Sequence, residues 1–133
     1  MRLPVVDASL LVAYLTGGEL AQEARDALFA DRRRIWAPHL VDAEIGHALR
    51  RIVRAGELSV RAARAALDDL EDLPLRRAGH LGLLSRAWEL RENVTFYDAL
   101  YVALAERLDL ALVTLDARLA SAPGVRARIE LIG

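Results

Sequence analysis

Two acidic residues follow apolar runs, at places where a carboxylate can do chemistry. Asp7 ends the run at residues 3–6, and Asp116 ends the run at residues 110–115. If both runs are parallel strands, their carboxyl ends meet at the sheet edge where open α/β folds bind ligands. Each residue taken alone could equally cap the helix that follows it. We expect Asp7 and Asp116 to face each other at this edge.

Two further acids are predicted to lie on helices that face the same region. Glu44 flanks an apolar stripe in the segment 39–55, where partial burial or a pairing with Arg51 would both be reasonable. Asp98 stands in the first turn of a helix predicted over residues 97–108, where it could also stabilise the helix dipole. Asp42 borders the same stripe as Glu44, and dipole stabilisation is the simpler interpretation of its position.

A cluster of these four acids would need a counter-charge. Two carboxylates about 4 Å apart repel by roughly 4 kcal/mol at an effective dielectric constant of 20. Lysine is absent from the chain, and all 18 basic residues are arginine. A divalent ion with hard oxygen ligands, Mg²⁺ or else Mn²⁺, would relieve the repulsion and support phosphodiester hydrolysis. In this hypothesis Asp7, Asp98 and Asp116 hold the ion, directly or through water. Glu44 also belongs to the metal site, through water, and positions or deprotonates the attacking water.

The composition excludes several other classes of protein. With 133 residues, 54% of them hydrophobic, and a net charge of −1, the chain is expected to form one domain over residues 1–133. The absence of cysteine removes disulfides, thiolate zinc sites and cysteine nucleophiles. The absence of lysine removes P-loop and Schiff-base chemistry and argues against a receiver domain. Asp7 interrupts the apolar start, and no stretch is long enough to span a membrane, so we expect a cytoplasmic protein.

Short apolar runs alternate with helical patterns along the chain. Strands are expected at residues 3–7, 35–37, 75–78, 110–114 and 126–132. Helices are expected at residues 9–15, 19–31, 39–55, 59–70, 81–91, 97–108 and 116–120. Strands separated by helices predict an α/β fold with three layers, in which helices cover both faces of a mainly parallel sheet.

Four blocks of the sequence resemble those of a known family. They are residues 5–9 (VVDAS), 38–44 (PHLVDAE), 97–106 (YDALYVALAE) and 112–119 (LVTLDARL). Together, and in this order, they resemble PIN-domain ribonucleases, most of all the VapC-type toxins of bacterial toxin–antitoxin pairs. The resemblance implies a PIN fold, ribonuclease activity that depends on Mg²⁺ or Mn²⁺, and an active site made of Asp7, Glu44, Asp98 and Asp116. Ser9 and Thr114 match positions where the family often has a small hydroxyl residue.

The same resemblance implies partners. VapC-type toxins form homodimers, and a small VapB-type antitoxin covers their active-site groove, often with an arginine near the acids. The implied substrate is structured cellular RNA such as a transfer RNA or a ribosomal RNA loop. Two alternatives stay open at this stage: a PIN-fold nuclease with a housekeeping role in RNA processing, and a PIN-like interaction module without catalytic activity.

The remaining polar and aromatic residues give weaker indications. Arginines cluster at 32–34, 50–54, 61–64 and 76–77, where they could guide RNA or simply be solvated, so no RNA-binding residue is assigned. The three histidines lack the spacing of a helical zinc pair. The aromatic residues Trp36, Trp88, Tyr97 and Tyr101 are expected in the core or in an interface.

Overall fold

The protein folds around a five-stranded parallel sheet. The computed structural model describes residues 4–30 and 34–133. The strand order is β3-β2-β1-β4-β5, and every neighbouring pair is parallel. The strands are β1 (Val5–Val6), β2 (Ile35–Pro38), β3 (Leu75–Ala78), β4 (Leu112–Thr114) and β5 (Ile129–Leu131).

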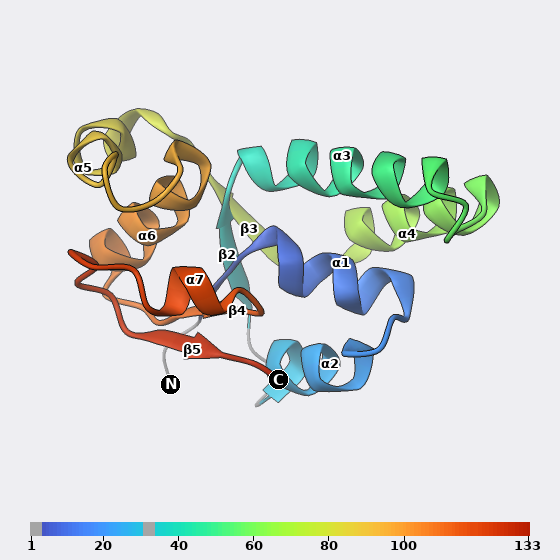
Figure 1. Cartoon of the computed structure of the whole chain (residues 1–133). Helices are drawn as coiled ribbons and strands as arrows, with labels where there is room; N and C mark the ends of the chain where they lie inside the picture. Colours follow the sequence, from blue (N-terminus) through green and yellow to red (C-terminus); the bar gives the residue numbers. More distant parts are fainter. Residues whose placement is uncertain (1–3, 31–33) are drawn as a thin grey trace.

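Helices cover both faces of this sheet. They are α1 (Ala8–Thr16), α2 (Ala21–Phe29), α3 (Leu40–Arg54), α4 (Val60–Asp72), α5 (Leu84–Glu89), α6 (Phe96–Leu108) and α7 (Ala117–Ala120), with a 3₁₀ turn at Leu81–Leu83 before α5. Figure 1 shows α1 to α4 on one side of the sheet and α5 and α6 on the other. The predicted three-layer α/β fold is therefore confirmed.

The core lies where β1 and α6 meet. In β1, Val5 pairs with Trp36 of β2 and with Leu112 of β4, which makes this strand the centre of the sheet. Residues 99–105 of α6 are all buried, as expected for a helix that is apolar on every side. This helix packs against β1, β2 and β4. Its first turn, which carries Asp98, is thereby fixed relative to the carboxyl ends of β1 and β4.

Several element boundaries differ from the sequence prediction. The single helix expected at 81–91 is a 3₁₀ turn followed by α5, which ends at Glu89. At this turn the Arg107 side chain approaches Gly82 closely and donates a hydrogen bond to its carbonyl oxygen at 3.0 Å. The strands expected at 110–114 and 126–132 are shorter, because the sheet pairs only residues 112–114 with 129–131. The expected residues Leu3, Asp31, Arg32 and Arg33 lie outside the described part of the chain.

The aromatic residues divide between interior and surface. Tyr101 is buried and Trp36 is half-buried, as expected for core residues. Trp88 and Tyr97 are instead 61% and 63% exposed, so assigning them to the core would be wrong. Both lie on elements whose inner face is already filled by other apolar residues, Ala87 on α5 and Leu100 on α6.

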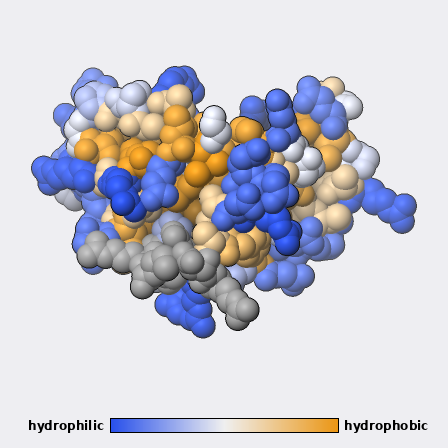
Figure 2. Space-filling model, turned by 90° about the horizontal axis from the view of Figure 1, so that it is seen from below, coloured by the Kyte–Doolittle hydropathy of each residue, from blue (hydrophilic) through white to orange (hydrophobic). Residues whose placement is uncertain are grey.

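The outer surface is mixed in character. Figure 2 views the molecule from below and shows hydrophobic residues across the middle of this face, with hydrophilic residues around them. Leu131 of the edge strand β5 is among the exposed apolar residues. Within the described residues, no helix is both long and apolar enough to cross a membrane.

Candidate active site

Asp7 lies at the centre of the site, directly after β1. It is the N-cap of α1, and its Oδ1 accepts hydrogen bonds from the amide of Leu10 at 3.2 Å and from the hydroxyl of Ser9 at 2.7 Å. Its side chain is only 5% exposed. The Asp7 carboxylate therefore both caps α1 and forms part of the site.

Two hydroxyl residues connect Asp7 to the loop after β4. The Thr114 hydroxyl donates a short hydrogen bond to Oδ2 of Asp7 and accepts one from the amide of Asp116 at 2.9 Å. The Ser9 hydroxyl in turn accepts a hydrogen bond from the amide of Leu115 at 3.3 Å. The structure thus gives Ser9 and Thr114 a shared task, which is to hold the loop that carries Asp116 against Asp7.

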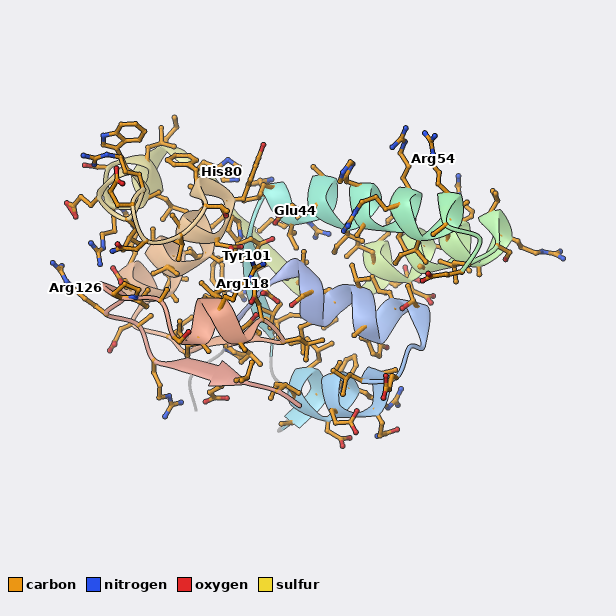
Figure 3. The ribbon with its side chains drawn as sticks, in the orientation of Figure 1. Glu44, Arg54, His80, Tyr101, Arg118 and Arg126 are labelled. Atoms are coloured by element: carbon orange, nitrogen blue, oxygen red, sulfur yellow. The ribbon has the colours of Figure 1, made fainter. Side chains whose placement is uncertain are left out.

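Glu44 reaches the site from α3, where it meets a residue of the opposite helix layer. The Tyr101 hydroxyl donates a 2.7 Å hydrogen bond to Oε1 of Glu44. Figure 3 shows Glu44 and Tyr101 converging from α3 and α6. This contact replaces the pairing with Arg51 that the sequence left open. Burial and the bond to Glu44 together raise the pKa of the Tyr101 hydroxyl well above its ordinary range, so it stays protonated and acts as a donor.

Asp98 lies in the first turn of α6. Thr95 caps this helix, and its hydroxyl accepts a hydrogen bond from the Asp98 amide at 3.1 Å. The backbone of Asp98 is therefore held by the cap, while its carboxylate faces the other acids. Asp42, the competing candidate on α3, is turned to β3 instead, where it forms a two-pronged ion pair with Arg77 at 2.7 and 2.8 Å.

Burial and the neighbouring acids raise the pKa of three of the four carboxylates. Burial, followed by repulsion from Asp116, raises the pKa of Asp7, although its three hydrogen bonds act in the opposite direction. Burial and repulsion from Asp98 and Asp7 raise the pKa of Glu44. Burial and repulsion from Asp116 and Asp7 likewise raise the pKa of Asp98. Asp7 thus lies within electrostatic range of Glu44, Asp98 and Asp116, and the functions of the four acids stay a prediction.

The donor set fits a hard divalent cation held partly through water. Carboxylate oxygens are the ligands that Mg²⁺ and Mn²⁺ prefer. Among residues 4–30 and 34–133, no three carboxylate or imidazole groups are spaced to bind one ion unaided. Since Mg²⁺ keeps several water ligands and commonly binds only one or two carboxylates, this spacing is compatible with such an ion. A cation would also oppose the repulsion that raises the pKa of three of the acids.

Two positioning residues were not found by sequence reasoning. Tyr101 was assigned to the core or an interface, and it is buried, but its hydroxyl also orients Glu44. A tyrosine three residues after Asp98 on a helix shares a face with it, and this spacing could have indicated the contact. His80 is not predicted to bind a metal, and its Nε2 accepts a hydrogen bond from the Leu40 amide at 3.0 Å, at the N-terminal end of α3. The sequence contains no local signal for this long-range cap.

Comparison with known proteins places this geometry in a family. The PIN domain family profile matches residues 5–125, which contain all four acids. Ribonuclease VapC1 of Mycobacterium tuberculosis is 52% identical over 130 residues, covering 96% of each chain. Ribonuclease VapC9 of the same organism is 42% identical over 129 residues, covering 96% of this chain and 97% of the relative. The chain belongs to the VapC group of the PIN-domain family.

Solved structures agree with the PIN fold. The PAE2754 protein of Pyrobaculum aerophilum has a TM-score of 0.70 and 28% identity, covering 96% of this chain and 82% of its own. The VapBC2 structure from Rickettsia felis, bound to a DNA fragment from its promoter, has a TM-score of 0.71 at 15% identity. The match covers 99% of this chain and 100% of the chain in that structure. At this low identity the second likeness concerns the fold alone. The family predicted from the sequence, that of the PIN domains, is thus confirmed.

Proposed function

We propose that this chain is a Mg²⁺-dependent endoribonuclease and the toxin of a VapBC-type pair, which hydrolyses phosphodiester bonds in structured cellular RNA. The observation that carries the proposal is the buried Asp7 carboxylate, tied to Thr114 and Ser9 and surrounded by three further acids. The relatives named as VapC ribonucleases support the same activity. The cytoplasm, where such RNA is found, is the proposed location.

Each acid has a task in this proposal. Asp7, Asp98 and Asp116 would hold Mg²⁺, or alternatively Mn²⁺, partly through water, and the ion when bound supplies positive charge to the phosphate under attack. Glu44 orients the attacking water and accepts its proton. Because Oε1 of Glu44 already accepts a hydrogen bond from Tyr101, we propose that Oε2 accepts the proton of the attacking water. A raised pKa makes this carboxylate a better base near neutral pH than an ordinary glutamate.

The activity is tested with purified protein and total RNA. We expect cleavage in Mg²⁺ and none in EDTA, with 5′-phosphate and 3′-hydroxyl ends, because water rather than the ribose 2′-hydroxyl attacks. Asp7→Asn and Asp98→Asn should abolish cleavage, whereas Asp68→Asn on the outer surface of α4 should not. Cleavage that persists in EDTA, or products with 2′,3′-cyclic phosphates, would show that this mechanism is wrong.

An apolar groove beside the acids suits the proposed antitoxin. It has a volume of about 850 Å³ and lies between α1 and α3, with Ser9 and Glu44 among its lining residues. Most of the lining is apolar, including Val12, Ala48 and Ile52. An apolar antitoxin segment would bury these residues, and an arginine at its end would reach the acids, since a guanidinium binds carboxylates with several fixed donors.

Co-expression tests the partner. A VapB-type protein from the neighbouring gene should relieve growth arrest and co-purify with this chain. Ala48→Glu would place an uncompensated charge in the groove and should reduce co-purification, while Ala65→Glu on the exposed face of α4 should leave it unchanged. If no neighbouring product binds while the ribonuclease activity is intact, the toxin assignment is wrong.

We also propose a homodimer, for which exposed apolar residues supply a surface. Leu84 and Trp88 are one helical turn apart on α5 and share a face, and Leu81 precedes them by one turn. All three side chains are exposed, and that of Leu81 is 89% exposed. Large apolar side chains grouped on a surface are typical of protein interfaces.

A further inference from the structure

A second hollow lies beside the acids, separate from the apolar groove. It has a volume of about 450 Å³, and Asp98 and Asp116 form part of its lining. The rest is formed by the segment 91–95, between α5 and α6, and by Arg118 and Leu119 of α7. Seven of its nine lining residues are polar or charged. This composition suits a polar ligand next to the acidic site.

Two arginines give the hollow its basic groups. Arg118 is 96% exposed, and its Nε lies 3.8 Å from Oδ1 of Asp116, at the edge of ion-pair distance. The charge of Arg118 partly offsets the burial and the repulsion that raise the pKa of Asp98, so the guanidinium lies within electrostatic range of both acids. Figure 3 labels Arg118 on α7, the helix that Asp116 caps. Arg118 can therefore contact a phosphate held near the acids.

The second arginine is fixed in place. The guanidinium of Arg91 lies 4.9 Å from the ring centroid of Trp88 and donates to the Trp88 carbonyl oxygen at 3.0 Å. A cation held in this way loses little conformational entropy when it binds a ligand. Asn93, another residue of the lining, adds an amide with both donor and acceptor atoms.

The two hollows differ in the ligand that they suit. The groove between α1 and α3 is mainly apolar and matches the apolar face of a peptide segment. The second hollow combines two guanidinium groups and an amide with the carboxylates of Glu92, Asp98 and Asp116. Guanidinium and amide groups bind phosphates and the polar edges of bases. An RNA strand that places one phosphate at the acids must continue beyond them, and the second hollow lies directly alongside.

We propose that the hollow formed by residues 91–95, Arg118 and Leu119 binds the nucleotide next to the scissile phosphate, with Arg118 on a backbone phosphate and Asn93 on the base. The inference rests on the proposed ribonuclease function and adds a substrate subsite to it. Arg118 is in this view a substrate-binding residue and Asn93 a residue that influences which sequence is cut.

The binding test uses a short fluorescein-labelled RNA of random sequence with the Asp7→Asn protein, so that the RNA is not cleaved. We expect Arg118→Gln to weaken binding about three- to tenfold and to reduce the slope of log K against log salt by about 0.7, as for one lost phosphate contact. Arg118→Lys should recover most of the affinity, because lysine also binds phosphate as a point charge. The matched control is Arg64→Gln, an arginine of α4 that is 77% exposed and pairs with Asp68 at 3.3 Å. This variant should change neither the affinity for RNA nor the salt slope.

An isosteric pair of variants tests the base contact. Asn93→Asp adds a carboxylate to the hollow without changing its size and should weaken RNA binding and shift the sequences that the otherwise native chain cuts. Gln22→Glu makes the same chemical change on the exposed face of α2. It should alter neither RNA binding nor the sequences that are cut. Far-UV circular dichroism and the melting temperature check that each variant folds.

The outcomes separate this subsite from the parent proposal. If the native chain cleaves RNA but Arg118→Gln behaves like Arg64→Gln, the subsite is wrong and the ribonuclease is retained. If the chain neither binds nor cleaves RNA, both proposals are wrong. If Arg118→Gln loses binding to the antitoxin and not to RNA, the hollow belongs to the protein partner and the subsite is again wrong.

Discussion

Thr114 connects two of the four acids, and it is completely buried. Its hydroxyl donates to Asp7 and accepts from the Asp116 amide. Thr114→Val keeps the shape but leaves both groups without this partner, so we expect a loss of roughly 1–3 kcal/mol in the free energy of unfolding. Displacement of the two acids should reduce cleavage on the order of tenfold to a hundredfold. Urea unfolding and initial cleavage rates measure the two effects.

Thr114→Ser is the control for this prediction. Serine retains the hydroxyl and loses only a methyl group, so stability and cleavage should stay much closer to those of the native chain. If the valine variant kept full activity, the hydroxyl bridge would not be what positions Asp7 and Asp116.

The burial of Asp7 also has a consequence for stability. Its pKa is raised in the folded state, so ionisation disfavours folding: the penalty is complete above the folded-state pKa and disappears as the pH falls toward the unfolded-state pKa. Without metal, Asp7→Asn should therefore stabilise the fold at neutral pH. The gain should shrink in acid. Urea unfolding in EDTA at several pH values measures it, and a variant that is less stable at neutral pH would contradict this account.

At the scale of elements, an ion pair joins α5, α6 and the segment before β5. Arg86 Nε and Nη2 donate to the two carboxylate oxygens of Glu106 at 2.7 and 3.2 Å, and Nη2 also donates to the Gly124 carbonyl oxygen at 2.7 Å. The Arg126 amide donates to Glu106 as well, at 2.8 Å. Although burial acts to raise the pKa of Glu106, these donors hold it below its usual value.

Glu106→Gln should therefore destabilise the protein in a pH-dependent way. The contribution of a carboxylate with a lowered folded-state pKa is complete above the unfolded-state pKa and is lost as the pH falls through the folded-state pKa. We expect a cost of about 1–2 kcal/mol at neutral pH, because the bond to arginine is charge-assisted, and little difference in strong acid. Chemical unfolding of native, Glu106→Gln and the exposed control Glu71→Gln measures this. A cost that did not depend on pH would contradict the ion-pair explanation.

The elements also show what the sequence can and cannot predict. Asp7 and Asp116 were placed at one sheet edge because local patterns predict strands and their order, and the parallel topology then determines the edge. The Tyr101 bond to Glu44 and the His80 cap of α3 join residues far apart in the chain, so no local pattern contains them. At the 3₁₀ turn that interrupts the helix expected at 81–91, the Gly82 carbonyl oxygen accepts a hydrogen bond from a distant side chain, that of Arg107. Periodicity determines the order of elements, whereas tertiary contacts determine their ends and the orientation of site residues.

At the scale of the whole molecule, the acids lie between two surfaces of different character. The apolar groove between α1 and α3 adjoins Glu44, and the polar hollow beside α7 adjoins Asp98 and Asp116. A protein inhibitor bound in the groove and an RNA strand bound in the hollow would therefore meet only at the acids. Inhibition would then require that the inhibitor cover the acids rather than the whole RNA path. The arginine proposed for the antitoxin would act at this common point.

The exposed face of α5 predicts how two copies associate. Leu84→Glu and Trp88→Glu each place a charge on the surface that the proposed homodimer buries, where an unpaired charge is costly. We expect the native chain to be dimeric by size-exclusion chromatography with light scattering, and both variants to be monomeric and folded. Val60→Glu is the control, since Val60 is 73% exposed at the start of α4, in the other helix layer. Because dissociation follows mass action, the melting temperature of the native chain alone should rise with protein concentration. A native chain that is monomeric, or variants that remain dimeric, would show that this face does not join two copies.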